Sequence, residues 1–275
     1  MFDWLKKKKT SKNETEELKE KEMPNGVPGS AVPLINNPMV KNLERIDIQI
    51  GAAAPEYLGT RYRNCASVTG DYRKLSDSIA TFLRVKRVRT VSVAGEDILS
   101  KTDEVNTVLG TAAIYNIENR LILTDGGISD GEKASGILSF ACTGVVIADG
   151  CVSSEVLDQL TENIPVISYS EQKEARSEQG MSGCAAEVFG NALNDVRTLV
   201  IGPDGEVRVC GFPIGNALER DLIDILEEYD PYSNPIMAMI LQGGPDAVAP
   251  LCNSDEVKLS GCNRCRALAA RLFAE

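Results

Sequence analysis

The chain has 275 residues, a net charge of −11 and no histidine. Its length suits one large α/β domain or two smaller ones, and a hydrophobic content of 43% is enough to form a core. The acidic balance argues against nucleic acid as a partner, because phosphate contacts need clustered Lys and Arg. The lack of histidine excludes Ser-His-Asp and Cys-His catalysis and leaves cysteine and carboxylate as metal ligands.

The N-terminal region predicts neither a signal peptide nor a membrane anchor. No apolar run approaches the roughly 20 residues that a membrane helix needs, and the first residues lack an apolar signal core. We therefore expect a cytoplasmic chain without a membrane span. Residues 1–40 combine the basic run from Lys6 to Lys9 with mixed charges, proline and glycine, and we expect them to form a disordered tail.

From residue 44 the chain alternates short β-branched runs with helical patterns. Helices are expected over 72–84 and 153–161, the second with Ser153 as its N-cap. Strands that alternate with helices indicate a parallel sheet, either open or an incomplete (β/α) barrel, whose ligand face lies at the carboxyl ends of the strands. The expected strands are 46–50, 88–93, 121–124, 145–148 and 165–168.

Residues 181–275 interrupt this alternation and predict a small C-terminal domain. A hairpin is expected over 198–210, with Pro203-Asp-Gly205 as its turn. Helical patterns follow over 218–229, 236–241 and 266–273, the first of them acidic and expected to present a solvated face. We therefore divide the chain into a tail (1–40), an α/β domain (41–180) and a C-terminal domain (181–275).

The cysteines indicate metal binding. Eight cysteines in a chain of cytoplasmic character favour thiolate–metal chemistry over disulfides. Four of them can converge on one centre: Cys184, Cys210, Cys262 and Cys265. Iron–sulfur and Zn(Cys)4 sites share these ligands, so both assignments stay open. Cys252 is a fifth candidate, which can take the place of Cys184.

The C-terminal third contains a series of short motifs in a fixed order: Cys184, the Pro203-Asp-Gly205 turn with Gly205-x4-Cys210, Ile214-Gly-Asn216 opening a helix, Tyr229-Asp-Pro231, Gly243-Gly-Pro245, and Cys262-x-x-Cys265 followed by a helix. In these elements and their order it resembles the auxiliary iron–sulfur domain, of the SPASM or the shorter twitch type, of radical S-adenosylmethionine (SAM) proteins. The resemblance implies one [4Fe–4S] cluster held by Cys184, Cys210, Cys262 and Cys265.

The α/β part is similar to the same family, so that the resemblance covers about residues 44–270. The second strand ends in Ala94-Gly-Glu-Asp97, where the family has Gly-Gly-Glu-Pro, and the third ends in Thr124-Asp-Gly126. The fourth, Val145 to Gly150, resembles the family's "VVVSLDG". The resemblance implies contacts to SAM from Gly95, Glu96, Asp125 and Asp149. Helix N-terminal carboxylates are the alternative interpretation of the two aspartates.

One departure from the family decides the functional prediction. The catalytic cluster of radical SAM proteins is held by C-x3-C-x2-C after the first strand, whereas residues 51–65 here contain only Cys65. One thiolate cannot hold that cluster. We therefore predict a non-catalytic radical-SAM-like protein with one auxiliary cluster. Its expected partner is a catalytic radical SAM protein or a peptide or protein substrate.

Two alternatives stay open. An active radical SAM maturase would need Cys65 together with two thiolates from elsewhere, such as Cys142 and Cys151. An α/β small-molecule-binding protein with a structural Zn(Cys)4 site would need no iron. Neither a Walker A sequence nor G-x-G-x-x-G follows a predicted strand, which gives the second alternative no nucleotide motif.

Overall fold

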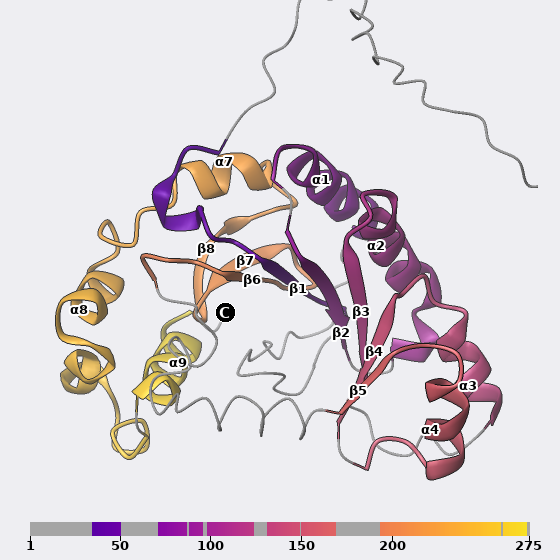
Figure 1. Ribbon diagram of the computed structural model, residues 1–275. Helices are drawn as coiled ribbons and strands as arrows, with labels where there is room; N and C mark the ends of the chain where they lie inside the picture. The colour runs from indigo at the N-terminus through magenta and orange to yellow at the C-terminus, as the bar shows by residue number, and fades with distance from the viewer. Residues whose placement is uncertain are drawn as a thin grey trace, which may run out of the picture. The chain divides into compact units, whose positions relative to one another are not determined.

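A computed structural model describes residues 35–50, 71–86, 88–95, 98–123, 131–148, 150–168, 193–259 and 261–273, except the side chains of 131–133, 262, 263 and 266. One eight-stranded sheet organises them, in the order β5-β4-β3-β2-β1-β6-β7-β8 (Figure 1). Residues 1–34, the first part of the expected tail, lie outside this description. In the described part of the chain, no helix is long and apolar enough to cross a membrane.

The first five strands are parallel and follow the chain order away from the centre of the sheet. Their order confirms the predicted α/β class and its mostly parallel sheet. β5 and β8 are the two edges, so the sheet is open. The strands are β1 (Arg45–Gln49), β2 (Thr90–Ala94), β3 (Glu118–Leu123), β4 (Gly144–Ile147) and β5 (Val166–Ser168).

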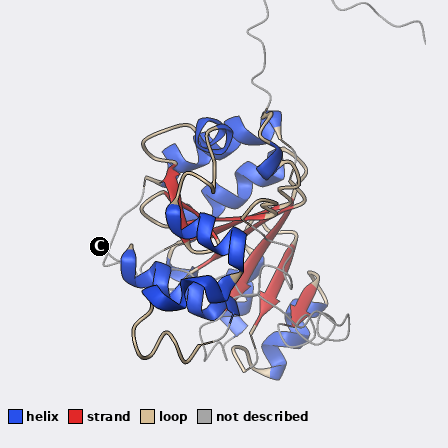
Figure 2. Ribbon diagram, turned by 90° about the vertical axis from the view of Figure 1, so that its left-hand side faces the viewer, coloured by secondary structure: helices blue, strands red, loops and turns tan. Residues whose placement is uncertain are grey.

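Helices cover one face of this sheet: α1 (Tyr72–Val85), α2 (Thr102–Ile114), α3 (Gly131–Leu138) and α4 (Ser154–Thr161), as Figure 1 shows. Short 3-10 segments lie at Pro38–Val40 (η1) and Ile98–Ser100 (η2). The predicted N-cap of α4 is confirmed, because the Ser153 hydroxyl accepts a hydrogen bond from the Val156 N–H at 3.3 Å. Figure 2 shows the twisted strands with the helices around them.

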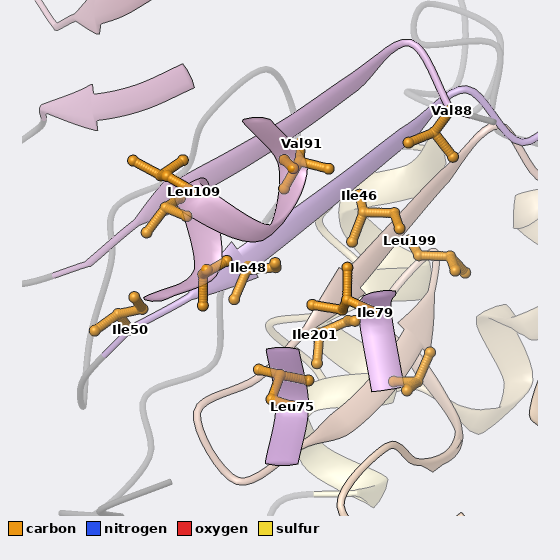
Figure 3. Packing of buried hydrophobic residues seen from close by; sticks show 14 of the residues in the cluster. Ile46, Ile48, Ile50, Leu75, Ile79, Val88, Val91, Leu109, Leu199 and Ile201 are labelled. Atoms are coloured by element: carbon orange, nitrogen blue, oxygen red, sulfur yellow. The ribbon is translucent and has the colours of Figure 1, made fainter. Parts of the chain in front are cut away.

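The core lies between β1, its neighbours and α1. Ile46 and Ile48 of β1 point to the same side as Leu75 and Ile79 of α1, and all four are fully buried (Figure 3). The helical spacing of the α1 residues and the strand alternation of the β1 residues place these side chains in one layer. Burial of each such side chain stabilises the fold by about 1.5–3 kcal/mol.

The C-terminal third extends the same sheet through three more strands. β6 (Thr198–Ile201) pairs with β1 in parallel, and β7 (Glu206–Val209) and β8 (Phe212–Asn216) continue it antiparallel. The predicted hairpin around Pro203-Asp-Gly205 is confirmed by the β6–β7 pairing. The boundary predicted between residues 180 and 181 falls in 169–192, outside the described residues, and stays a prediction.

Three helix expectations for this part need correction. Ile214-Gly-Asn216 does not open a helix, because these residues pair with β7 as strand β8. The acidic helix is only α7 (Leu222–Glu227), and its residues Leu222, Ile223, Ile225 and Leu226 are buried, so it is an amphipathic helix on the sheet. The last helix is α9 (Gly261–Leu272), which begins before the C-x-x-C because Cys265 continues the apolar spacing of Leu268 and Ala269.

The remaining elements are α8 (Pro235–Gly243), which covers the predicted helix 236–241, and the 3-10 segment η3 (Pro245–Leu251). At the other end of the described chain, Asn37 joins η1 to α7. Its amide Nδ2 donates to the carbonyls of Leu226 at 2.8 Å and Tyr229 at 2.7 Å. Val40 in η1 is buried in the core, so packing begins inside the segment expected as tail.

The β6–β7 turn is locked by the strand that follows it. The Gly205 N–H donates to the Gly202 carbonyl at 3.0 Å, and the Asn216 Nδ2 donates to the Asp204 carbonyl at 3.0 Å. The Ala217 N–H donates back to the Gly205 carbonyl at 2.8 Å. These contacts explain why a Pro-Asp-Gly turn and a Gly-Asn pair occur together in this chain. The turn provides carbonyl acceptors, and Asn216 and the residue after it provide the N–H donors that bond to them.

Gly205→Ala should destabilise this hairpin. Gly205 has a φ of 82°, and a Cβ there would lie 2.4 Å from Leu218 Cγ and 2.6 Å from Asn216 Oδ1. We expect a loss of about 2 kcal/mol in the free energy of unfolding, measured by urea denaturation. Gly110→Ala in α2, where a Cβ meets nothing within 4 Å, is the matched control and should be neutral or stabilising. Equal effects of the two substitutions would contradict this account of the turn.

Candidate functional site

The predicted SAM-binding residues belong to the carboxyl ends of the strands, and the structure describes one of them. Gly95 directly follows β2, while Glu96, Asp125 and Asp149 lie outside the described residues. A Cβ on Gly95 would lie 1.9 Å from the Ile50 carbonyl oxygen. The end of β1 therefore approaches so closely that only glycine fits, whether or not a ligand binds there.

A second set of residues, absent from the predicted sites, lies on the sheet face opposite the α1 side. Because side chains alternate along a strand, the partners of the apolar core residues point to this other face. We call these residues the polar face. In the β1–β2 and β2–β3 registers, Asp47 stands opposite Ser92, and Ser92 stands opposite Arg120. The polar face comprises Arg45, Asp47, Gln49, Thr90, Ser92, Glu118, Arg120, Thr198, Glu206 and Arg208.

Within the described strands, ion pairs between residues i and i+2 recur on the polar face. Arg45 Nη2 lies 2.8 Å from Asp47 Oδ2, and the Asp47 side chain is fully buried. On β3, Arg120 Nη2 lies 2.6 Å from Glu118 Oε1. A parallel sheet is ordinarily apolar on both faces. The buried charged residues on this face are therefore not needed to form the sheet, and they mark the face as a candidate binding surface.

β7 carries an ion pair of the same i, i+2 kind, close in the chain to Cys210. Arg208 pairs through Nε with Glu206, and both side chains are largely buried. Its Nη1 donates to the Gly211 carbonyl at 3.3 Å, in the loop that contains Cys210. Among the described residues, neither Arg208 Nη2 nor the buried Ser92 Oγ has a hydrogen-bond partner. These groups can hydrogen-bond a polar ligand at a face that is already desolvated.

The sequence contains a signal for the polar face that was missed. Charged or hydroxyl residues alternate with β-branched ones in Arg45-Ile-Asp-Ile-Gln49, Thr90-Val-Ser-Val93 and Glu206-Val-Arg-Val209. Such alternation is typical of a strand with one apolar and one polar face.

Cys210 occupies an unusual backbone position. It forms, with Gly211, the loop between β7 and β8, and the two residues have φ values of 51° and 87°. Two positive φ values are the pattern of a type I′ hairpin turn, whose first position favours Asn, Asp or Gly. A cysteine there costs conformational energy that an asparagine would not. An outlier of this kind is a reason to look for a function of the side chain.

The surroundings of Cys210 include a buried tyrosine. The Tyr229 hydroxyl donates to the Leu193 carbonyl at 2.7 Å. Burial raises the pKa of Tyr229 well above its usual range, and the negative charges of Cys210 and Asp230 raise that pKa further. Tyr229 therefore stays neutral and serves as a hydrogen-bond donor beside the hairpin.

Cys252 and Cys265 share a second location. Cys265 is buried in a small apolar cluster with Val248 and Leu268, and Cys252 packs against that cluster. Burial raises the pKa of the Cys265 thiol to about 11, and the neighbouring Cys252 adds to the rise. At neutral pH the metal-free chain therefore holds Cys265 as a thiol, and a metal has to displace its proton.

The predicted thiolate centre is thus described only in part. Cys184 and the side chain of Cys262 lie outside the described residues, although Cys262 stands one turn before Cys265 in α9. Cys210 lies in the β7–β8 loop, whereas Cys265 lies in α9. Among the described residues, no group of three His, Cys, Asp or Glu side chains could hold a metal ion.

The thiols of the alternative catalytic cluster are also separated. Cys142 precedes β4 and Cys151 follows it, and a strand of that length spans about 13 Å. Cys151 belongs to the core, and burial raises the pKa of Cys142. Both have the environment of structural cysteines. Cys65 lies outside the described residues.

Comparisons with known proteins bear on the fold. No protein-family model matches the chain, and no curated protein matches it. The solved structure of BtrN in complex with AdoMet and 2-DOIA has 13% sequence identity and a TM-score of 0.50, with 82% of this chain and 93% of that chain covered. At this identity the likeness shows the fold alone: the α/β fold of this chain is similar to that of BtrN.

Two further structures are more distant. SuiB of Streptococcus suis bound to S-adenosylmethionine has 13% identity and a TM-score of 0.42, covering 82% of this chain and 76% of that chain. SuiB bound to the precursor peptide SuiA has 12% identity and a TM-score of 0.33, covering 82% and 75%.

Gly95→Ala tests the steric account of the β2 end. Its Cβ would meet backbone, which cannot move without breaking the hydrogen bond of 2.8 Å from the Ile50 N–H to the Ala94 carbonyl. We expect a loss of about 2–3 kcal/mol in the free energy of unfolding, in the absence of any ligand. Gly136→Ala in α3, with open space at its Cβ, is the control. Unchanged unfolding of Gly95→Ala would leave ligand binding as the reason for this glycine.

Ser92→Ala tests whether the polar face is maintained for stability. The Ser92 hydroxyl is buried and has no hydrogen-bond partner, so its removal should leave the free energy of unfolding unchanged or raise it by up to about 1 kcal/mol. The melting temperature should accordingly stay the same or rise. Ser153→Ala removes a hydroxyl that does cap a helix, and it should cost about 1 kcal/mol. Greater destabilisation by Ser92→Ala than by Ser153→Ala, in differential scanning calorimetry, would contradict the prediction.

Proposed function

We propose that this chain is a radical-SAM-like protein that carries one auxiliary [4Fe–4S] cluster in its C-terminal third and acts as a non-catalytic partner in peptide or protein modification. The observation that carries the proposal is the combination of a radical-SAM-like fold with a segment after β1 that offers only Cys65. A catalytic cluster in that segment would lack two of its three thiolates. The peptide setting rests on the resemblance of the C-terminal motifs.

The donors in the C-terminal third fit an iron–sulfur cluster in their chemistry. Soft thiolates are the ligands that such clusters use. Cys210 is held in a conformation that cysteine disfavours, and Cys265 is buried in an apolar cluster. We assign Cys184, Cys210, Cys262 and Cys265 as the residues that would hold the cluster. When bound, the cluster supplies one-electron transfer; the chain's own residues position the thiolates and exclude water.

The parallel sheet would bind the ligands, which are SAM and a segment of the substrate or partner. Gly95, Glu96, Asp125 and Asp149 would contact SAM at the carboxyl ends of the strands if the chain has kept that cofactor. The polar face would meet the polar groups of a substrate or of a bound segment of the partner, since Ser92 and Arg208 have donors to offer there. Neither role requires cleavage of SAM by this chain.

Metal and sulfide analysis of anaerobically purified full-length protein tests the proposal. We expect about four iron and four sulfide per chain, an EPR signal after reduction with dithionite, and no cleavage of SAM by the isolated chain. Cys142→Ala, outside the proposed ligand set, should keep its iron. About eight iron with SAM cleavage would instead identify an active maturase. Zinc without iron would identify a structural Zn(Cys)4 site.

A further inference from the structure

The strand registers place one row of side chains across the polar face. In the β1–β2 and β1–β6 pairings, Asp47 stands between Ser92 and Val200. In the β6–β7 pairing, Val200 stands opposite Arg208. Paired residues of neighbouring strands have their side chains on the same face of the sheet. Since neighbouring strands lie about 4.8 Å apart, the row from Ser92 to Arg208 spans about 14 Å.

The two ends of this row carry buried donors that lack an acceptor. The exposed fraction of Ser92 is 1% and that of Arg208 is 9%. Within the part of the chain that the structure describes, neither Ser92 Oγ nor Arg208 Nη2 has a hydrogen-bond partner. Thr90, two residues before Ser92 on the same face, does donate its hydroxyl to Glu118 Oε2, at 3.4 Å. A buried donor without a partner destabilises a fold, so an acceptor supplied by a ligand would account for both positions.

The charges of the polar face are already matched within single strands. Each of its three arginines pairs with the acidic residue two positions away: Arg45 with Asp47 at 2.8 Å, Arg120 with Glu118 at 2.6 Å, and Arg208 with Glu206. Three arginines and three carboxylates give this face a net charge of zero. A charged ligand group would therefore be desolvated there without compensation, which is strongly unfavourable. The two donors thus fit a neutral acceptor, such as an amide carbonyl, better than a carboxylate or a phosphate.

The middle of the row is apolar and accessible. Val200 is half-buried on the polar face, whereas Leu199 and Ile201 on either side of it in β6 are fully buried in the core. A ligand that fits the row therefore has an apolar group at its centre and acceptors at both ends. The span of the row exceeds a compact small molecule. An extended peptide rises about 3.3 Å per residue and carries a carbonyl on each, so about four residues cover it.

We propose that the polar face binds an uncharged, extended peptide segment. Main-chain carbonyls of this segment accept hydrogen bonds from Ser92 Oγ and Arg208 Nη2, and an apolar side chain of the segment lies over Val200. The inference deepens the proposed function and rests on its peptide setting, but it does not depend on the iron–sulfur cluster. Ser92 and Arg208 are then the residues that determine which segments bind, and acidic or basic segments are excluded.

Retention of peptides on the immobilised full-length chain tests the inference. The probes are acetylated, amidated hexapeptides in three pools: one holds only uncharged residues, one holds a single acidic residue in each peptide, and one holds a single lysine in each. We expect mass spectrometry to show the uncharged pool retained at least about tenfold more than either charged pool, because the face does not compensate a further charge. Acetylated, amidated single amino acids cannot span the row and should not be retained.

Two conservative substitutions assign the retention to this row. Arg208→Lys keeps the positive charge but removes Nη2, and it should lower retention of the uncharged pool about tenfold. Ser92→Ala should lower it about fivefold. The matched controls are Arg220→Lys at an exposed arginine and Ser153→Ala at the N-cap of α4, and both should keep the wild-type retention. Thermal melting verifies that each variant is folded, and Ser92→Ala decides the test where Arg208→Lys is not.

The outcomes separate this inference from the proposed function. Equal retention of the three pools, or wild-type retention by folded Ser92→Ala and Arg208→Lys, overturns the inference whatever the iron content. Preference for the acidic pool identifies an anion site and also overturns it, as does equal retention of the single amino acids. If no pool is retained by a chain that holds about four iron, the inference fails and the proposed cluster stands. Selective retention of the uncharged pool by a chain without iron supports the inference and ends the cluster proposal.

Discussion

The two faces of β1 determine how the rest of the structure is arranged. On one face, Ile46 and Ile48 pack against α1, and on the other Arg45 and Asp47 form a buried ion pair. A shift of one residue in the register would place the ion pair in the apolar core and the isoleucines on the polar face. Desolvated charges without partners cost several kcal/mol each, so the alternation of β1 specifies one register. The neighbours on both sides inherit this register through the β1–β2 and β1–β6 pairings.

Because β6 pairs with β1, the C-terminal third is attached to the centre of the sheet rather than appended to its edge. The hairpin continues the polar face through Arg208, and that arginine also braces the loop of Cys210 by its bond to the Gly211 carbonyl. The polar face and the β7–β8 loop are thus linked by one side chain. A change at the thiol loop would alter the hydrogen bonds of Arg208, and a ligand on the polar face would act on the same residue.

Local sequence patterns predict most of the helices and strands, but they do not predict which strands pair with one another in the sheet. β1, α1 and the N-cap of α4 could be read from periodicity and capping, because those signals act within a few residues. The pairing of β6 with β1 could not be predicted, since it joins segments 153 residues apart and depends on the whole sheet. The family resemblance predicts that Ile214-Gly-Asn216 opens a helix, whereas in the structure these residues form β8. Gly215 leaves room there for Ile225, whose side chain would lie 2.9 Å from a Cβ. The location of Cys252 beside Cys265 likewise depends on the packing of η3 against α9, which no pattern within one segment predicts.

The distribution of thiols argues for a division of labour between the two parts of the chain. Cys142 and Cys151 stand at opposite ends of β4, where the sheet itself keeps them apart. In the C-terminal third, by contrast, the fold tolerates two separate costs to place cysteines: a positive φ at Cys210 and the burial of Cys265 next to another thiol. Natural proteins retain such energetically unfavourable placements mainly at positions where the side chain has a function. Under the proposed function, the parallel sheet would provide the ligand face, and the hairpin together with α9 would provide the thiolates.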